Sequence, residues 1–195
     1  MDKAQALKRI DELKARQQMI NKTWQKTVNR ELLDFFVDIL PRLLDAERCG
    51  IFIHDPVKND VWLHAGTGLQ AQELTVPVRT SLVGRVISSG EAVIENDLDN
   101  QIGAHDAVAI KTGFITYTAI CVPIFGASRQ RVTGAVEVLN KKRGLHFDEQ
   151  DKQLLERVAR LIQIQVENLF ARQELINISE EINKQIAMLE KRLAG

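Results

Sequence analysis

The sequence lacks an excess of charge of either sign. It contains 26 Lys and Arg residues and 26 Asp and Glu residues, so its formal net charge at pH 7 is +0. A chain with equal numbers of positive and negative charges has no net positive potential that would attract nucleic acid or an anionic membrane nonspecifically. We therefore expect neither nucleic acid nor a membrane as a partner.

Long apolar runs are missing as well. No run approaches the roughly 18 residues that a membrane-spanning helix needs, and the first residues, MDKAQALKRIDELKARQQ, are charged throughout, unlike a signal peptide. We expect a soluble protein of the cytosol. Its 195 residues, 45% of them apolar, suffice for one well-buried domain with helical extensions.

Cysteine is scarce, since Cys49 and Cys121 are the only two. They are too few for a disulfide framework or a thiolate zinc site, and each sits inside or beside an apolar run, so we expect inert buried thiols. Ser-His-Asp and P-loop patterns are absent too. We expect no metal site and no enzymatic activity.

Helix breakers are rare at both ends of the chain. From residue 3 to about residue 46, apolar residues recur in steps of three, four or seven, which predicts a long amphipathic helix that Pro41 kinks or resets near its end. After Phe147, with Asp148 as a cap, no proline follows and no glycine precedes Gly195. This stretch predicts a second long helix.

The second helix has two apolar stripes. The earlier stripe should pack on the domain, whereas the later one has no domain left to cover and is best buried by another copy of itself. Several apolar pairs are eleven residues apart, which favours a straight or slightly right-handed coil. We therefore expect a parallel homodimer through the terminal helices and assign residues 1–30 to a coiled-coil helix, 31–170 to the domain and 171–195 to a signalling helix. The later stripe consists of Leu175, Ile178, Ile182, Ile186, Leu189 and Leu193.

Between residues 48 and 140 the apolar period changes to two, with Gly, Pro, Asn and Asp between short β-branched runs. This pattern predicts a sheet. A helix at residues 82–88, capped by Thr80 or Ser81 and ended by Gly90, should interrupt it, and residues 96–113 should form a loop with short helical pieces. The expected strands, which fit a six-stranded antiparallel sheet, cover residues 49–54, 61–65, 74–78, 92–94, 116–124 and 132–139.

Four segments, AERCGIFIHD, SLVGRVISSGEAVIENDL, KTGFITYTAICVPI and GAVEVLNKKRGLHFDEQD, occur in this order. Together they resemble the GAF domain, and most closely the regulatory GAF domains of cyclic nucleotide phosphodiesterases and of cyanobacterial-type adenylate cyclases. The resemblance covers about residues 32–170. It implies an α+β, GAF/PAS-like fold with a six-stranded antiparallel sheet, helices packed on one face, and a small-molecule pocket on the other face.

Many ligand-binding members of that family share Asn-Lys, a variable gap, Phe, three residues, and then Asp-Glu. The matching residues here are Asn140, Lys141, Phe147 and Asp151, and Lys152 replaces the final glutamate. Lys141, at a strand end, can pair with Asp151 in the first turn of the last helix. We favour this structural role over direct ligand contact.

Glu137 lies mid-strand in TGAVEVLN. Alternation puts Val136 and Val138 on an all-apolar face that should meet the helices, so Glu137 should look into the pocket. Burying a carboxylate costs free energy unless a group donates a hydrogen bond to it. A ligand amine, amide or hydroxyl could be that donor. Alternatively, Glu137 bonds a backbone amide or Thr118 and carries no ligand. The resemblance favours the ligand, because Glu137 aligns with a pocket glutamate of the phosphodiesterase pattern.

The start of the expected short helix is a candidate anion site. Backbone N–H groups of Leu82, Val83 and Gly84 lie there at a positive dipole end, where a cyclic phosphate fits. Gly84 is equally well explained as a helix-packing residue.

The resemblance adds further candidate ligand contacts. It implies that Thr112 lines the pocket and that Gly50 stands where related domains often have serine. Phe52 would then share the pocket face, either stacking on a base or filling the core. Ala109 and Ile110 replace acidic residues of the phosphodiesterase domains, so contacts made there to a base edge are lost. The nearby loop around His105, Asp106 and Lys111 is a possible substitute.

These features predict a noncatalytic regulatory sensor. Its leading ligand candidate is a cyclic nucleotide, cAMP or cGMP, whose binding shifts the last strand and helix and so signals to an output domain or partner protein. The alternative is a structural dimerisation module with a self-filled pocket. Methionine sulfoxide reduction, known in some GAF proteins, needs a resolving cysteine pair, which Cys49 and Cys121 do not form. Haem ligation would rest on a lone His54 or His105.

Overall fold

The computed structural model of the chain describes residues 30–55, 59–68, 74–98, 113–126 and 130–194. Contacts divide the chain into two units, Arg30–Glu167 and a second unit of Met1–Asn29 with Asn168–Gly195. The first unit contains helix α2 (Arg30–Leu43), helix α3 (Leu82–Ser89) and the sheet. Helix α5 (Glu149–Ala194) begins in the first unit and continues into the second.

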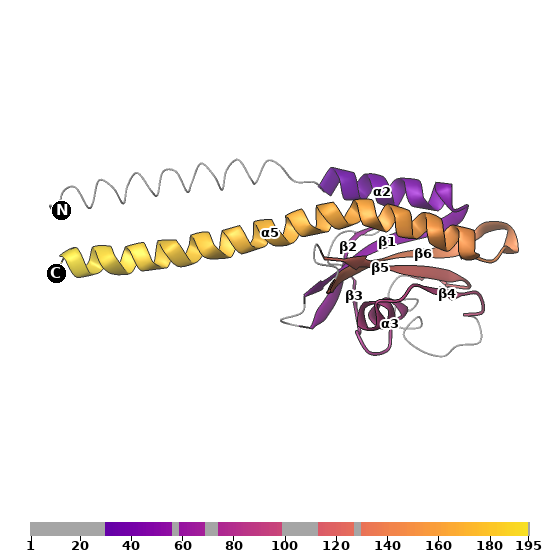
Figure 1. The fold of residues 1–195 in the computed structure, drawn as a ribbon, viewed down its shortest axis with the longest axis horizontal. Coiled ribbons are helices and arrows are strands. Elements are labelled where there is room, and N and C mark those ends of the chain that lie inside the picture. The colour runs from indigo at the N-terminus through magenta and orange to yellow at the C-terminus, as the bar shows by residue number, and fades with distance from the viewer. Residues whose placement is uncertain (1–29, 56–58, 69–73, 99–112, 127–129, 195) are drawn as a thin grey trace. The chain divides into compact units, whose positions relative to one another are not determined.

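The sheet is antiparallel and six-stranded, with the strand order β3-β2-β1-β6-β5-β4 (Figure 1). The longest strands, β1 and β6, pair at its centre. A short 3-10 helix, Lys142–Gly144, connects β6 to the segment before α5. The strands are β1 (Ala46–Asp55), β2 (Asp60–Gly66), β3 (Thr75–Val76), β4 (Val93–Glu95), β5 (Ala119–Phe125) and β6 (Val132–Lys141).

Helices cover the two faces of the sheet differently. Helix α2 and the start of α5 lie along one face, and α3 lies on the other (Figure 1). Residues of β5 and β6 alternate between the faces, so that Ile120 pairs with Val138 on the α2 side while Cys121 pairs with Glu137 on the α3 side. The α2 side is buried by residues such as Leu33, Leu40, Leu155 and Ile162.

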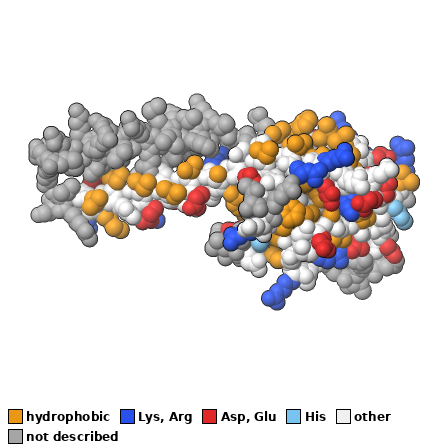
Figure 2. Space-filling model, viewed as in Figure 1, with side chains coloured by type: hydrophobic (Ala, Val, Ile, Leu, Met, Phe, Trp, Pro, Cys, Tyr) orange, Lys and Arg blue, Asp and Glu red, His pale blue; other side chains and the backbone are white. Residues whose placement is uncertain are grey.

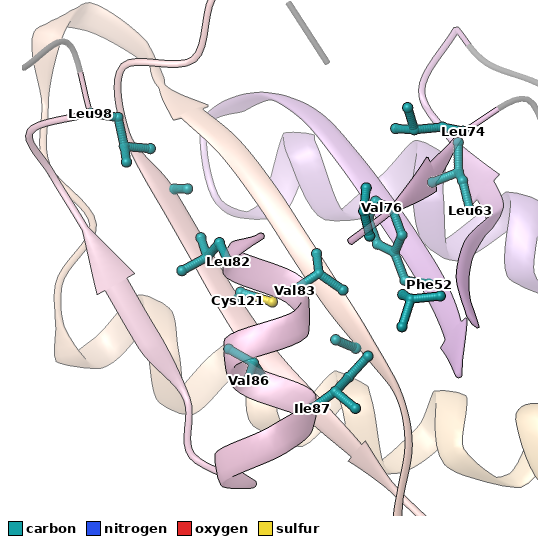
Figure 3. Packing of buried hydrophobic residues seen from close by; sticks show 13 residues of the cluster. Phe52, Leu63, Leu74, Val76, Leu82, Val83, Val86, Ile87, Leu98 and Cys121 are labelled. Atoms are coloured by element: carbon teal, nitrogen blue, oxygen red, sulfur yellow. The ribbon is translucent and has the colours of Figure 1, made fainter. Parts of the chain in front are cut away.

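The α3 face has its own apolar cluster (Figure 3). Side chains of α3 meet residues of β1, β2 and β3 there, and the sheet contributes small residues opposite the helix. The members include Phe52, Leu63, Leu74, Val76, Leu82, Val83, Val86, Ile87, Leu98, Ala119, Cys121 and Ala135.

The fold expected from the sequence is confirmed, with helices on the sheet and a long C-terminal helix. Ser81 is the cap of α3, because its Oγ accepts from the Gly84 amide at 2.9 Å, and Gly90 ends the helix at φ 70°. Helix α2 ends two residues after Pro41. β3 is shorter than expected, since the Pro77 that follows it has no amide to donate. The first half of the N-terminal helix and most of the expected loop at residues 96–113 lie outside the described residues.

Candidate functional site

A small cavity of about 60 Å³ opens between the α3 face of the sheet and the start of α3. Its walls come from β1, β2, β3, β6 and α3. They include five residues proposed from the sequence as ligand contacts: Gly50, Phe52, Leu82, Val83 and Glu137. Thr112, the remaining loop candidate, lies outside the described residues, as do Ala109, Ile110 and the segment from His105 to Lys111.

Glu137 contributes a carboxyl group to the wall of this cavity. The strand register sets Glu137 beside Gly50 of β1 and Cys121 of β5, and only 9% of its surface is exposed. No residue of the described part of the chain donates a hydrogen bond to its carboxylate or pairs with it. Burial raises the pKa of Glu137 to about 7, because the charged form loses its hydration.

Thr118, the sequence-based alternative partner for Glu137, is engaged elsewhere. Its Oγ1 accepts a hydrogen bond from the Lys141 amide at 2.9 Å, and its own amide donates to Asn140 Oδ1 at 3.3 Å. Within the described residues, Thr118 makes no hydrogen bond to Glu137, so the structure does not support the interpretation in which Thr118 satisfies this carboxyl. The Glu137 carboxylate on β6 can therefore accept a hydrogen bond from a donor group that enters the cavity.

Gly50 leaves the cavity open in front of Glu137. A Cβ at this position would lie 2.9 Å from Phe52 Cε2 and 3.1 Å from Leu63 Cδ1, so a side chain there would collide with the cavity wall. Phe52 is 3% exposed and belongs to the apolar cluster while its ring also lines the cavity. Both suggested roles of Phe52, core filler and cavity wall, are compatible with this position.

Gly84 does not line the cavity. Its amide is already bonded to Ser81 Oγ, and a Cβ at this position would lie 2.0 Å from the Val78 carbonyl oxygen. The expectation of a free Gly84 amide is therefore wrong, and the glycine permits close packing of α3 on the preceding segment. Leu82 and Val83, the two residues before Gly84, line the cavity wall.

Arg48 and Phe114 form an edge of the cavity that sequence patterns did not reveal. The Arg48 guanidinium lies 3.9 Å from the centre of the Phe114 ring, a cation–π contact. Arg48 is on β1 and Phe114 precedes β5, so no local pattern links them. The cavity thus has a cation at one edge and the Glu137 carboxyl within it.

The two thiols near Glu137 are unsuited to nucleophilic chemistry. Burial, and secondarily the Glu137 charge, raise the pKa of both Cys49 and Cys121 far above the usual thiol range. A nucleophilic cysteine needs the opposite shift, since the thiolate is the reactive form. The register also separates them, because Cys121 shares the face of Glu137 while Cys49 pairs with Val138 of the other face.

The Asn-Lys motif links the strand of Glu137 to α5. Lys141 Nζ bonds both carboxylate oxygens of Asp151 at 2.7 Å, and the two side chains are each only 14% exposed. Asp151 Oδ2 also accepts from the Asp148 amide, while Asp148 Oδ1 accepts from the Gln150 and Asp151 amides. This reciprocal cap fixes the first turn of α5 against the end of β6.

Asn140 and Phe147 hold neighbouring segments in place. Asn140 is 4% exposed; its Oδ1 accepts from the Tyr117 amide at 2.7 Å and its Nδ2 donates to the Ile115 carbonyl and to Glu47. Phe147 is bonded through its backbone to both side-chain amide atoms of Asn96. The sequence did not single out Asn96, because its partner is 51 residues away.

Lys152, which replaces the family's glutamate, forms a salt bridge with Glu149. Its Nζ lies 2.8 Å from a carboxylate oxygen of Glu149, one turn earlier, and this hydrogen bond raises the pKa of Lys152. The substitution therefore leaves the Lys141–Asp151 pair intact. Among the residues that the structure describes, no group of three or more His, Cys, Asp or Glu side chains could hold a metal ion.

A six-stranded antiparallel sheet with long helices on one face and a small cavity under a short helix on the other defines a class of regulatory, small-ligand-sensing domain. The chain belongs to the GAF domain family, whose model matches residues 29–166. None of the helices in the described ranges is long and apolar enough to cross a lipid bilayer.

Two curated relatives are phosphodiesterases. The chain is 28% identical to the dual 3',5'-cyclic-AMP and -GMP phosphodiesterase 11A of Takifugu rubripes over 126 residues, which is 58% of this chain and 14% of that protein. It is 30% identical to a probable 3',5'-cyclic phosphodiesterase, pde-5, of Caenorhabditis elegans over 128 residues, which is 59% of this chain and 17% of that protein. The match is therefore confined to a small part of each relative.

Solved structures share the fold. The GAF domain of a phosphoenolpyruvate-protein phosphotransferase from Coxiella burnetii has a TM-score of 0.65 and 20% identity, covering 81% of this chain and 96% of that one. Free methionine-R-sulfoxide reductase from Neisseria meningitidis has a TM-score of 0.59 and 18% identity, covering 78% and 86%. Because the first structure is a domain of a phosphotransferase and the second is a reductase, the fold alone does not fix the activity.

Proposed function

We propose that the chain is a noncatalytic sensor domain whose cavity binds a small ligand through Glu137. The observation that carries this proposal is the buried carboxyl without a donor among the described residues. A buried acceptor without a partner lowers stability, and a ligand donor removes that cost. A ligand amine, amide or hydroxyl directed at Glu137 is the simplest group that fits.

A cyclic nucleotide, cAMP or cGMP, is the leading ligand. Two named relatives are cyclic nucleotide phosphodiesterases, and the cavity provides complementary groups. In this proposal a donor of the base binds Glu137, the Phe52 ring provides an apolar surface, and the phosphate binds near the start of α3. The residues invoked, Glu137, Phe52, Leu82 and Val83, all line the cavity. Arg48 at the cavity edge adds a second anion contact.

Ligand binding requires the cavity to widen. Its free volume of about 60 Å³ is well below the roughly 300–1,000 Å³ of pockets that bury drug-sized ligands. A nucleotide therefore selects a more open state, and the difference in affinity between the two states is what a sensor transmits.

The strand β6 and the Lys141–Asp151 pair provide the route of transmission. Glu137 and Lys141 are four residues apart on one strand, and Lys141 binds the first turn of α5. A shift of β6 on binding therefore moves the start of α5. In the native protein a homodimer through the terminal helices passes this movement to an output domain.

The competing function is a structural dimerisation module without a ligand. It is favoured by the small cavity and by the apolar side chains that fill much of its surroundings. Catalysis of the sulfoxide reductase kind is disfavoured by the raised pKa values of both thiols.

Thermal unfolding against a panel of cyclic and linear nucleotides separates these functions. A specific ligand at about 100 times its Kd adds about 2.7 kcal/mol of stability, a Tm increase of several degrees. We expect that increase with cAMP or cGMP for the wild-type chain. A panel with no shift for any nucleotide favours the dimerisation module.

A further inference from the structure

Two glycines on neighbouring strands line the cavity beside Glu137. Gly50 of β1 pairs with Gly66 of β2 and, on its other side, with Glu137 of β6, so the three residues form one row across the sheet. We call Gly50 and Gly66 the glycine floor. Glu137, at the end of this row, is 9% exposed and accepts no hydrogen bond from the described part of the chain.

Backbone conformation does not explain the glycine floor. Neither glycine has a positive φ, so the backbone at both positions permits an L side chain. The atoms nearest to an added Cβ are side-chain carbons at both positions, whereas at Gly84 and Gly134 they are carbonyl oxygens at 2.0 and 2.2 Å. Glycine inside a strand lowers stability, and it often marks a place where a ligand approaches the backbone closely. The glycine floor therefore provides space above the sheet.

Leu63 fills this space in the structure. A Cβ added at Gly66 would lie 2.9 Å and 3.1 Å from the two Leu63 methyl carbons, and one added at Gly50 would lie 3.1 Å from Leu63 Cδ1. The Leu63 side chain, which is 2% exposed, therefore lies over both glycines. The Phe52 ring borders it, and Figure 3 shows both side chains at the same end of the apolar cluster.

A β-bulge directs Leu63 over the glycine floor. Between consecutive residues of β1, the β2 partner changes from Ala65 to Leu63, so His64 is an extra residue in β2. The bulge puts Leu63 and Gly66, three residues apart, on the same face of the sheet, although regular alternation would separate them. The Leu63 amide donates to the Leu74 carbonyl at 2.8 Å and holds the backbone in place. A change of side-chain rotamer is therefore the simplest way to uncover the floor.

We propose that the glycine floor is the subsite for a flat heteroaromatic ring, and that Leu63 occupies this subsite until a ligand displaces it. In the bound state the ring lies on the two glycines, and an N–H donor on its edge binds Glu137. This inference rests on the proposed function for the role of Glu137. It adds the surface on which the ring lies and the side chain that limits access to it.

The shape of the floor favours a flat ring. Ring carbons can contact peptide backbone at about 3.5–4.0 Å only where no Cβ projects, and both glycines meet that condition. The row spans two strand spacings, about 10 Å, which accommodates a bicyclic ring with a donor at its end. Displacement of Leu63 also adds the space of its side chain to the free cavity of about 60 Å³. The required widening thus has a defined source.

Titration of 2-aminobenzimidazole, a flat bicyclic ring with N–H donors on one edge, tests the subsite. Leu63→Ala uncovers the floor, and Leu98→Ala is the matched control, because Leu98 belongs to the same apolar cluster but does not line the cavity. By NMR titration we expect Leu63→Ala to bind this probe at least about tenfold more tightly than wild type and Leu98→Ala, since no side chain has to leave first. Equal binding by all three chains overturns the proposal. If Leu63→Ala does not fold, Leu63→Val, which retains a branched strand residue, should show a smaller gain in the same direction.

A methyl group on the floor tests where the ring lies. Adding Gly66→Ala to Leu63→Ala places a Cβ on the floor, and the side chain that would crowd it is already shortened. We expect the probe affinity to return to the wild-type value. Tight binding by the double variant, or no nuclear Overhauser contact between the probe and the Gly50 backbone in Leu63→Ala, contradicts the proposal.

These titrations contain no nucleotide, so they separate the subsite from the proposed ligand. A wild-type chain that binds neither cAMP nor cGMP contradicts the proposed ligand, whereas tighter probe binding by Leu63→Ala still supports the subsite. Conversely, nucleotide binding by wild type together with no gain for Leu63→Ala leaves the proposed function intact and shows that Leu63 does not cover the ring subsite.

Discussion

At the scale of single residues, Glu137 determines most of the chemistry of the cavity. It lies mid-strand among apolar neighbours, opposite Gly50 and Cys121, and burial raises its pKa to about 7. A carboxyl that is harder to ionise when folded binds protons more tightly in the native state than in the unfolded chain. The chain retains this unfavourable group at a place where a ligand can satisfy it.

The first prediction is a pH-dependent stability due to Glu137. Its pKa rises from 4.5 to about 7 on folding, so its contribution to stability falls as pH rises from 4.5 to 7 and is constant above. Relative to wild type, Glu137→Gln should be near neutral at pH 4.5 and more stable by about 3 kcal/mol at pH 8. Urea unfolding of both chains across this range measures the difference. A difference that does not vary with pH contradicts the raised pKa.

The second prediction concerns Gly84. An alanine Cβ at this position would lie 2.0 Å from the Val78 carbonyl oxygen, so α3 would have to shift away from the segment that precedes it. We expect Gly84→Ala to destabilise the chain by about 1–3 kcal/mol. Ser88→Ala, on the exposed side of α3, should change stability by less than about 0.5 kcal/mol. Comparable denaturation midpoints for the two variants would show that α3 tolerates the added methyl group.

At the scale of elements, several side-chain hydrogen bonds constrain the junction of β6 and α5. The Lys141–Asp151 pair is largely buried and bidentate, and Asp151 also completes the cap of α5 with Asp148. By contrast, the Lys152–Glu149 pair lies on the exposed side of the same turn. The two pairs therefore form a natural comparison.

The third prediction follows from that comparison. Asp151→Asn leaves the Lys141 ammonium without its carboxylate and should cost about 2–4 kcal/mol, because one partner of a largely buried pair is lost. Glu149→Gln, in the exposed pair, should cost less than about 1 kcal/mol. Chemical denaturation gives both values. If Asp151→Asn also abolishes the ligand-induced Tm increase while the folded chain persists, the pair belongs to the transmission route.

The elements were predictable from sequence because their signals are local. The strands follow from an apolar period of two. The helix ends follow from residues next to them, namely Ser81 before α3, Gly90 after it and Asp148 before α5. The cavity was only partly predictable. Alternation placed Glu137 on the correct face, but the Arg48–Phe114 contact and the Asn96–Phe147 bonds join distant parts of the chain. The misassigned Gly84 amide is a different case, because its partner Ser81 lies only three residues earlier and was already expected as the cap.

At the scale of the whole molecule, we expect α5 to connect the domain to a second copy of the chain. Its first turns contribute buried residues such as Leu155 and Ile162, whereas Leu175, Ile178 and Ile182 further along the helix are exposed apolar residues. Figure 2 shows apolar side chains in a row along the C-terminal half of α5. In the proposed function, a movement at the start of α5 acts on the same helix that we expect to pair with a second copy. The proposed dimer would then take part in transmission as well as holding two domains together.

The fourth prediction concerns assembly. Ending the chain after Phe170 removes the later apolar stripe of α5, whose residues Leu175, Ile178, Ile182 and Leu189 are exposed. We expect the shortened chain to dimerise at least tenfold more weakly in sedimentation equilibrium. Unchanged dimerisation would place the interface elsewhere on the molecule.

The most direct test of the sensor function is calorimetric titration of cAMP and cGMP into wild type, Glu137→Gln and a matched Glu91→Gln control on the exposed surface. The buried carboxyl without a donor predicts that wild type and Glu91→Gln bind one of these nucleotides with equal affinity. It also predicts that Glu137→Gln binds that nucleotide at least tenfold more weakly. Equal affinity in all three chains removes Glu137 from the site, and no binding by wild type contradicts the cyclic nucleotide sensor.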